Sequence, residues 1–140
     1  MKAIDYADYI VKKTQALNQT VTHLQLQQIL FLIAAEYQRT NATYPFNPAE
    51  KFEAWGYGPV MPSVYQMYHH YELMPIETYQ HSIFDYQTYQ WKVSQVNENN
   101  LDATFKNIVD QSLAQLLQIN VFKLVWYNHQ QPFWINRFKS

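Results

Sequence analysis

The 140 residues of this chain suffice for one domain with its own core, and the absence of cysteine excludes disulfides, thiolate metal sites and a cysteine nucleophile. Ten basic and eleven acidic residues nearly cancel, so no strong overall field attracts nucleic acid or anionic lipid. No stretch has the roughly 20 apolar residues of a membrane-spanning helix, and Asp5 and Asp8 interrupt the apolar N-terminus, unlike in a signal peptide. We therefore expect a soluble, cytoplasmic protein with no membrane partner and no preference for nucleic acid.

Two helices are predicted in the first 40 residues. Apolar residues recur at three- and four-residue steps from Ile4 to Leu17, as on a helix with one buried face. Thr22 and Gln25 form a capping-box pattern that opens a second helix, HLQLQQILFLIAAEYQ, which is apolar almost all round and should be central. A helix-turn-helix is the alternative, because Gln25, Gln27 and Gln28 could read base edges. The apolar surface favours the core helix instead.

The middle of the chain contains fewer regular signals. NATYPFNPAEKF is a predicted loop because of its prolines and asparagines, and residues 52–57 could form a short strand. Pro62 fits the first turn of a third helix that ends before Pro75. Between Pro75 and Asn100 only Tyr89, Trp91 and Val93 alternate as on a strand.

Two further helices are predicted in the last 40 residues. Asn100 is the predicted cap of the fourth, and Asn120 that of the fifth, which runs from Val121 to about His129. One stripe of the fourth helix is apolar: Leu101, Phe105, Ile108, Val109, Leu113, Leu116 and Leu117. The expected fold is mainly α, a single-domain bundle of about five helices over residues 1–140, with or without a small β-hairpin.

The motifs of common enzymes and cofactor sites are missing from the sequence. Both glycines lie in WGYGP, which lacks the Gly-Lys-Ser/Thr of a phosphate-binding loop. Ser63 lies between Pro62 and Val64, not between the glycines of a nucleophile elbow. Neighbouring helical positions point about 100° apart, so His69 and His70 cannot chelate as a pair. We expect no catalytic residues, metal or cofactor, and a hydrolase using His129 or His69 is a minor alternative.

The most unusual segment is KFEAWGYGPVMPSVYQMYHHY, residues 51–71. It concentrates Trp55, Tyr57, Tyr65 and Tyr68 around a tight turn at Gly58-Pro59. Such a corner either fills a gap between helices or presents an exposed aromatic anchor to a partner. General burial statistics favour the core alternative, because tryptophan is usually largely buried.

These motifs, in this order, resemble the SocA-like antitoxin domain family, also called Panacea. LQLQQILFLIAAEY is similar to the family's Leu-x-Lys-Leu-Leu-Tyr helix, FEAWGYGPVMPSVY to its Glu-Ala-Trp-x-x-Gly-Pro-Val-x-x-x-x-Tyr signature, and NHQQPFW to its closing His and Pro-x-Trp-like end. The chain departs at Gln28, where the family has a basic residue, and at Pro132-Phe133-Trp134. The matching positions are Leu26, Ile29, Leu30, Glu53, Ala54, Trp55, Gly58, Pro59, Val60, Tyr65, His129 and Trp134.

The resemblance implies a protein that binds and neutralises a cognate toxin, either as a simple inhibitor or as an adaptor to a cellular protease. The alternatives are a DNA-binding regulator of its own operon and a phage accessory protein. His129 and Trp134 are either a binding pair or a buried closure of the last helix, and closure is favoured. The candidate partner-binding residues are Trp55, Tyr57, Gly58, Pro59, Val60, Tyr65, Tyr68, His129 and Trp134.

Overall fold

The computed structural model describes residues 2–77, 81–94, 96 and 98–131. These residues form five α-helices, two short 3-10 helices (η) and two antiparallel β-hairpins, which confirms the predicted mainly helical fold. One hairpin more is present than was predicted. In chain order the elements are α1 (Ala3–Ala16), α2 (His23–Asn41), β1 (Glu53–Trp55), β2 (Gly58–Val60), α3 (Pro62–Tyr68), η1 (His69–Tyr71), β3 (His81–Asp85), β4 (Gln90–Ser94), η2 (Glu98–Asn100), α4 (Ala103–Leu116) and α5 (Val121–His129).

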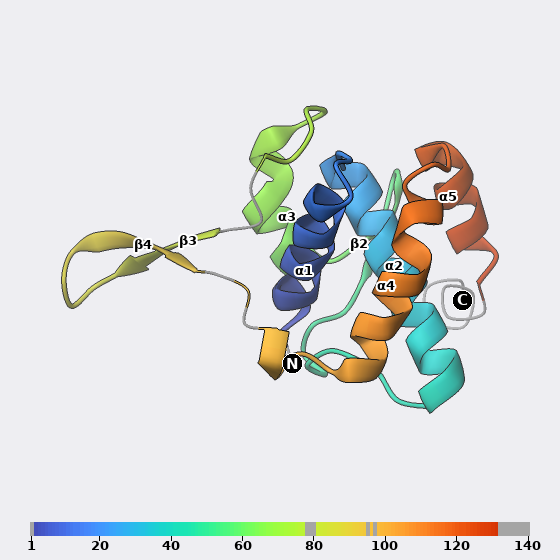
Figure 1. Ribbon diagram of the computed structural model, residues 1–140, viewed down its shortest axis with the longest axis horizontal. Helices are drawn as coiled ribbons and strands as arrows, with labels where there is room; N and C mark the ends of the chain where they lie inside the picture. Colours follow the sequence, from blue (N-terminus) through green and yellow to red (C-terminus); the bar gives the residue numbers. More distant parts are fainter. Residues whose placement is uncertain (1, 78–80, 95, 97, 132–140) are drawn as a thin grey trace.

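Helix α2 is the central element, as its apolar sequence predicts. It packs against α1, α3, α4, α5 and strand β2, and Figure 1 shows it enclosed between these elements. The predicted capping box is present at its start: the Thr22 hydroxyl accepts from the Gln25 amide at 3.2 Å, and the Thr22 amide donates to the Gln25 side chain at 2.9 Å. This cap fixes the first turn of the helix, from which the candidate site is built.

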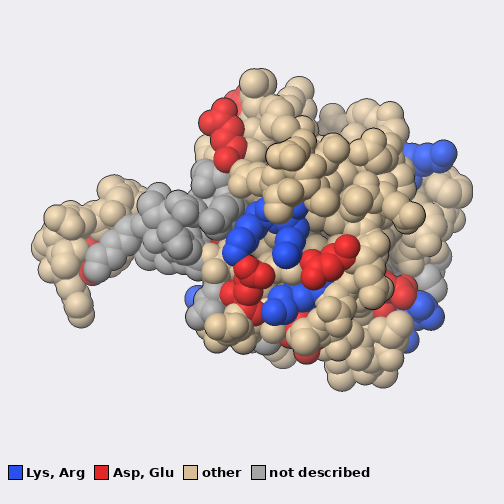
Figure 2. Space-filling view, in the orientation of Figure 1, with Lys and Arg blue, Asp and Glu red and all other residues tan. Residues whose placement is uncertain are grey.

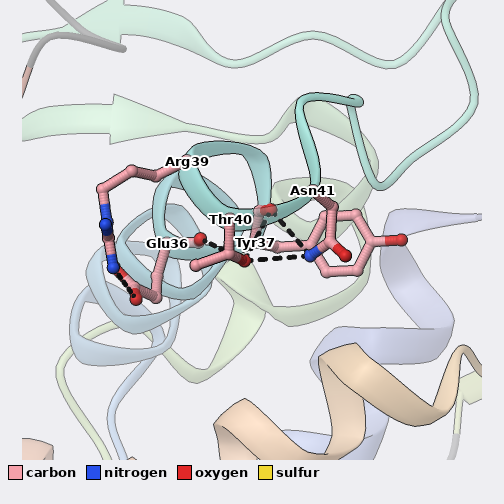
Figure 3. A network of polar contacts seen from close by, with 5 residues as sticks. All are labelled: Glu36, Tyr37, Arg39, Thr40 and Asn41. Atoms are coloured by element: carbon pink, nitrogen blue, oxygen red, sulfur yellow. Dashed lines mark hydrogen bonds and ion pairs between the residues drawn. The ribbon is translucent and has the colours of Figure 1, made fainter.

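The far end of α2 is closed by its own side chains (Figure 3). Arg39 binds Glu36 through two nitrogens, at 2.6 and 3.0 Å, while Thr40 and Asn41 donate to the Tyr37 carbonyl. Ala42 follows in the left-handed conformation with φ 57°. The Ala42 amide donates to the Gln38 carbonyl at 2.9 Å and so satisfies one of the carbonyls that the last turn of a helix leaves without an intrahelical partner.

Aromatic rings join α1, α2, α4 and the loop after α2 in the core. The Phe105 ring of α4 lies 4.2 Å from that of Tyr6, 5.8 Å from that of Phe46 and 5.9 Å from that of Tyr37, between ring centroids. The Tyr6 hydroxyl also accepts from the backbone amide of Asp102 at 3.0 Å. Helices α1 and α4 are therefore joined by packing and by a hydrogen bond.

The predicted cap of the fourth helix is wrong by two residues. Asn100 ends the 3-10 helix η2, and Asp102 is the cap, its carboxylate accepting from the Phe105 amide at 3.0 Å. The cap of the fifth helix is confirmed, because Asn120 accepts from the Phe122 amide at 2.9 Å. The third helix starts at Pro62 as predicted, but its regular part ends at Tyr68, well before Pro75.

The two hairpins differ in their surroundings. β1 and β2 pair with Glu53 opposite Val60 and Trp55 opposite Gly58, and β2 packs against α2 and α5. β3 and β4 pair from His81 opposite Ser94 to Asp85 opposite Gln90, and Figure 1 shows this hairpin projecting away from the helices. The first hairpin is part of the body of the protein, whereas the second is an arm.

Charges of both signs are intermixed on the face shown in Figure 2. Lys12 of α1 pairs with Glu98 of η2, and this contact lowers the pKa of the Glu98 carboxyl. Within the described ranges, no helix combines the length and hydropathy needed to cross a bilayer.

Candidate functional site

The turn between β1 and β2 is held by a buried amide of α2. Gln28 is fully buried, and its Nε2 donates to the carbonyls of Tyr57 and Pro59, each at 3.3 Å. Asn128 of α5 in turn donates to the Gln28 side-chain oxygen at 3.1 Å and to the Gln28 backbone carbonyl at 3.0 Å. Three segments far apart in sequence therefore meet at one buried polar group, which fixes the turn on the body of the protein.

Glycine is required at position 58 for two reasons. Its φ is +107°, a conformation that side-chain-bearing residues rarely adopt. A Cβ placed there would also lie 2.9 Å from Oε1 and 3.1 Å from Nε2 of Gln28. The glycine allows the strand to approach the Gln28 amide closely enough for the hydrogen bonds to form.

On the outer side of this turn, Trp55, Tyr65 and His69 form a cluster that we call the aromatic corner. The Trp55 and Tyr65 rings meet edge to face at 4.8 Å, and the Tyr65 and His69 rings stack at 4.7 Å. Trp55 is 39 % exposed and Tyr65 36 %, while the Trp55 indole nitrogen donates to Glu53 at 3.0 Å. The cluster is thus half-exposed and held in place by contacts among its own members.

The aromatic corner rests on a buried polar chain from α2. Gln27 accepts from the Met61 amide at 2.8 Å, and its Nε2 lies 3.0 Å from Nε2 of His23, whose ring packs 5.5 Å from that of Tyr65. Because the Gln27 oxygen accepts from Met61, its amide nitrogen donates, so Nε2 of His23 must accept and the ring proton lies on Nδ1. Burial, together with the nearby His69 and His70, lowers the pKa of His23 to about 4.

This arrangement predicts a loss of stability under mildly acidic conditions. His23 titrates near 6.5 when unfolded but near 4 when folded, so between these values the unfolded state binds a proton that the folded state does not. The free energy of unfolding should therefore fall as the pH drops from about 6.5 towards 4. Urea unfolding of the wild type and of His23→Gln between pH 7 and 5 measures this, and the variant should show a flatter dependence. His70→Gln, which removes an exposed histidine, should keep most of the slope; equal slopes in all three proteins would contradict the assignment.

The predicted partner-binding residues fall into two groups. Trp55, Tyr57 and Tyr65 reach the surface, and Tyr57, at the tip of the turn, is 69 % exposed. Trp55 does not plug a gap between helices, which corrects the favoured core alternative for that side chain. The other described candidates are buried or half-buried: Gly58, Pro59, Val60 and Tyr68 are buried and His129 is half-buried, while Trp134 lies outside the described residues.

Tyr68 supports the site from below, because its hydroxyl donates to the buried carboxylate of Asp8 on α1. Burial and the neighbouring carboxylate of Asp8 raise the pKa of this phenol. A direct contact between Tyr68 and a partner is therefore incompatible with this structure. Its contribution is to fix α3, and with it Tyr65, against α1.

A family comparison bears directly on this site. The model of the family described as antitoxin SocA-like, Panacea domain matches residues 26–135. The chain belongs to this SocA-like Panacea family. The matched range begins within α2 and includes the β1–β2 turn, the aromatic corner and all of α4 and α5. Comparisons with curated proteins and with solved structures gave no match.

Sequence reasoning missed the polar residues that hold the site of this Panacea domain. These residues are the buried amides Gln27, Gln28 and Asn128. The sequence indicated them only by placing polar side chains on the apolar faces of predicted helices. A buried amide in such a place needs a specific partner. The burial of Gln27 and Gln28 also removes them from base readout, which supports the core-helix prediction over the helix-turn-helix.

No cluster of three or more His, Cys, Asp or Glu side chains suited to a metal ion occurs in the part of the chain that is described. His23 is occupied by Gln27, and His69 is bound through Nδ1 to the Tyr65 carbonyl at 2.8 Å. The surroundings of the corner are therefore hydrogen-bonded aromatic and amide groups. Such groups can bind another surface by shape, apolar contact and hydrogen bonding.

Proposed function

We propose that this Panacea domain neutralises a cognate toxin by direct binding, and that the aromatic corner with Tyr57 contacts the toxin. The observation that supports this most strongly is the family match over residues 26–135, since the SocA-like family is one of antitoxins. Within the matched range, the β1–β2 turn and α3 bring three exposed aromatic side chains, Trp55, Tyr57 and Tyr65, to one region.

The corner has the properties of a binding hot spot. Tryptophan and tyrosine are enriched among residues that dominate binding energy, because they bury a large area and lose little rotamer freedom. Trp55 is already oriented by Tyr65 and by the hydrogen bond to Glu53. A partner would therefore meet side chains whose ordering cost has largely been met during folding.

Binding could inhibit the toxin and go no further, or it could inhibit the toxin and then deliver it to a cellular protease. We infer simple inhibition as the primary mode, because a corner whose side chains are already oriented by one another can mask a toxin surface without any further component. The adaptor mode predicts a shorter toxin half-life when this chain is present. Measuring the toxin level after translation is stopped, with and without this chain, separates the two modes.

Co-expression tests the proposal in cells. The protein encoded by the neighbouring open reading frame should arrest growth when produced alone, and co-production of this chain should restore growth. The two proteins should also co-purify. A neighbour that is harmless and does not co-purify would remove the support for an antitoxin function.

Substitution in the corner tests the proposed surface. Trp55→Ala and Tyr65→Ala should each weaken toxin binding roughly 10- to 30-fold, as expected for an interfacial aromatic residue that contributes about 1.4–2 kcal/mol. The measurement is titration calorimetry with the purified toxin. Phe122→Ala removes an exposed aromatic ring from α5 and should leave the affinity unchanged. If all three variants bind like the wild type, the toxin binds elsewhere.

A further inference from the structure

The β3–β4 hairpin carries a second group of exposed aromatic side chains, which we call the hairpin cluster: Tyr86, Tyr89 and Trp91. They are 78 %, 79 % and 71 % exposed. All three rings pack around Phe84, at centroid distances of 4.9, 6.3 and 5.3 Å respectively. The strands pack mainly against each other, and Figure 1 shows the hairpin extending away from the helices. The cluster is therefore ordered by its own contacts and open to solvent.

Tyr89 occupies a position that would suit glycine. It lies at the end of the turn between β3 and β4 with φ +55°, a left-handed conformation that is unfavourable for a bulky side chain. Glycine adopts this conformation without a steric penalty. The Tyr89 ring is 79 % exposed although it packs beside Phe84, and backbone strain of this kind is characteristic of functional positions.

The hairpin as a whole also lacks the packing that would stabilise it. A two-stranded hairpin alone in water is only marginally stable, and it gains stability from a third strand or from packing against another surface. Among the residues that the structure describes, β3 and β4 pair with each other and no further strand joins the sheet. An apolar, aromatic tip on such an arm would be stabilised by burial in a partner.

The chemistry of the tip favours a protein as this partner. Residues 84–91, FDYQTYQW, contain Asp85 as their single charge and no basic residue. Lys92, directly after Trp91, is the nearest basic residue along the chain, and one lysine is too few to hold a phosphate backbone or an anionic membrane. Tyrosine, tryptophan and glutamine side chains instead combine apolar area with hydrogen-bonding groups, as in protein interfaces.

The size of the cluster argues against a second copy of this chain held only through the arm. Three aromatic side chains of ~200 Å² each, about three-quarters exposed, offer roughly 450 Å². A stable interface of standard size needs about 800 Å² from each partner. The arm therefore supplies part of a larger interface that also includes the body of the protein.

We propose that the β3–β4 hairpin is a toxin-binding arm that inserts the hairpin cluster into an apolar pocket on the toxin. This rests on the proposed function, to which it adds a second contact region and the chemistry of its receptor. The body binds through the aromatic corner, and the arm extends the interface beyond it. The complementary toxin surface is uncharged and apolar, with hydrogen-bond acceptors at its rim for the tyrosine hydroxyls.

Titration calorimetry with the toxin encoded by the neighbouring open reading frame tests the arm. Trp91→Ala should weaken binding about 10-fold or more, the usual effect of losing an aromatic anchor. Tyr89→Gly relieves the backbone strain but loses the ring contact with Phe84, so the melting temperature should change little while binding weakens about 5- to 10-fold. Trp126→Ala, which removes an exposed tryptophan from α5, should change neither quantity.

The outcomes separate the arm from the antitoxin function. If Trp91→Ala and Tyr89→Gly bind and neutralise the toxin as well as the wild type does, the hairpin does not contact the toxin. The proposal of a toxin-binding arm is then overturned, whereas the proposed antitoxin function stands. If the wild type binds no toxin, both are overturned. If the variants keep toxin binding but lower the molar mass of the free protein in light scattering, the hairpin contacts a second copy of the chain, which also overturns the proposal.

Discussion

Gly58→Val is expected to destabilise the protein by about 3 kcal/mol and to lower its melting temperature by roughly 10 °C. A valine at φ +107° is strained, and its Cβ would lie 2.9 Å from the buried Gln28 amide. Because Gln28 is also bound by Asn128, the amide cannot withdraw without breaking a second contact. The variant should bind toxin more weakly as well, since the turn carries Tyr57 and adjoins Trp55.

Gly56 provides a matched control within the same turn. A Cβ at position 56 meets nothing within 4 Å, and the residue does not have a left-handed φ. Gly56→Ala should therefore change stability by less than about 0.5 kcal/mol, like an ordinary surface substitution. Differential scanning calorimetry on both variants gives the comparison. Equal melting temperatures for Gly58→Val and the wild type would show that the close approach at Gln28 is not needed.

Gln28→Leu is expected to cost about 2–3 kcal/mol of stability, although the side chains are similar in size. The substitution leaves the Tyr57 and Pro59 carbonyls without the amide that binds them and removes one of the two acceptors of Asn128, the Gln28 side-chain oxygen. Buried polar groups that lose their partners retain their full desolvation cost. The free energy of unfolding in urea measures the effect.

Gln111→Leu, at an exposed position of α4, is the control and should change stability by no more than about 0.5 kcal/mol. Asn128→Leu should be destabilising alone but add less than its full effect to Gln28→Leu, because the two amides share a hydrogen bond. A Gln28→Leu protein as stable as the wild type would mean that the turn is held by packing alone.

The helices were predictable because their signals are local. Periodic apolar residues identified α1, α2 and α4, the cap at Asn120 identified α5, and the Thr22 capping box is a pattern within four residues. The cap of α4 was misplaced because Asn100 and Asp102 are both good cap formers. The Tyr6 hydroxyl binds the Asp102 amide across 96 residues of sequence, and a single-sequence pattern does not contain that contact.

The candidate site was predicted only in part, because its exposure depends on contacts between segments far apart in sequence. The sequence placed Trp55, Tyr57, Tyr65 and Tyr68 at one corner, but their exposure depends on how β1 and α3 pack against the body. At position 28 the side chain both donates to carbonyls of the β1–β2 turn and accepts from Asn128, and the amide of Gln28 can do both.

The arm was the least predictable element. Tyr89, Trp91 and Val93 indicated a strand, but the partner strand β3 has no comparable alternation, and its pairing depends on a turn with Tyr89 in the left-handed conformation. A tyrosine at such a position is not a turn signal. The segment therefore indicated a hairpin only weakly, although it is the most exposed aromatic part of the described chain.

The most direct test of neutralisation by binding is to titrate the purified toxin with this protein and follow residual toxin activity and complex mass together. Toxin activity should fall linearly and reach its minimum when a stable complex of defined stoichiometry has formed, with Trp55→Ala needing a higher concentration. Loss of activity at far less than stoichiometric amounts, without a detectable complex, would contradict neutralisation by binding.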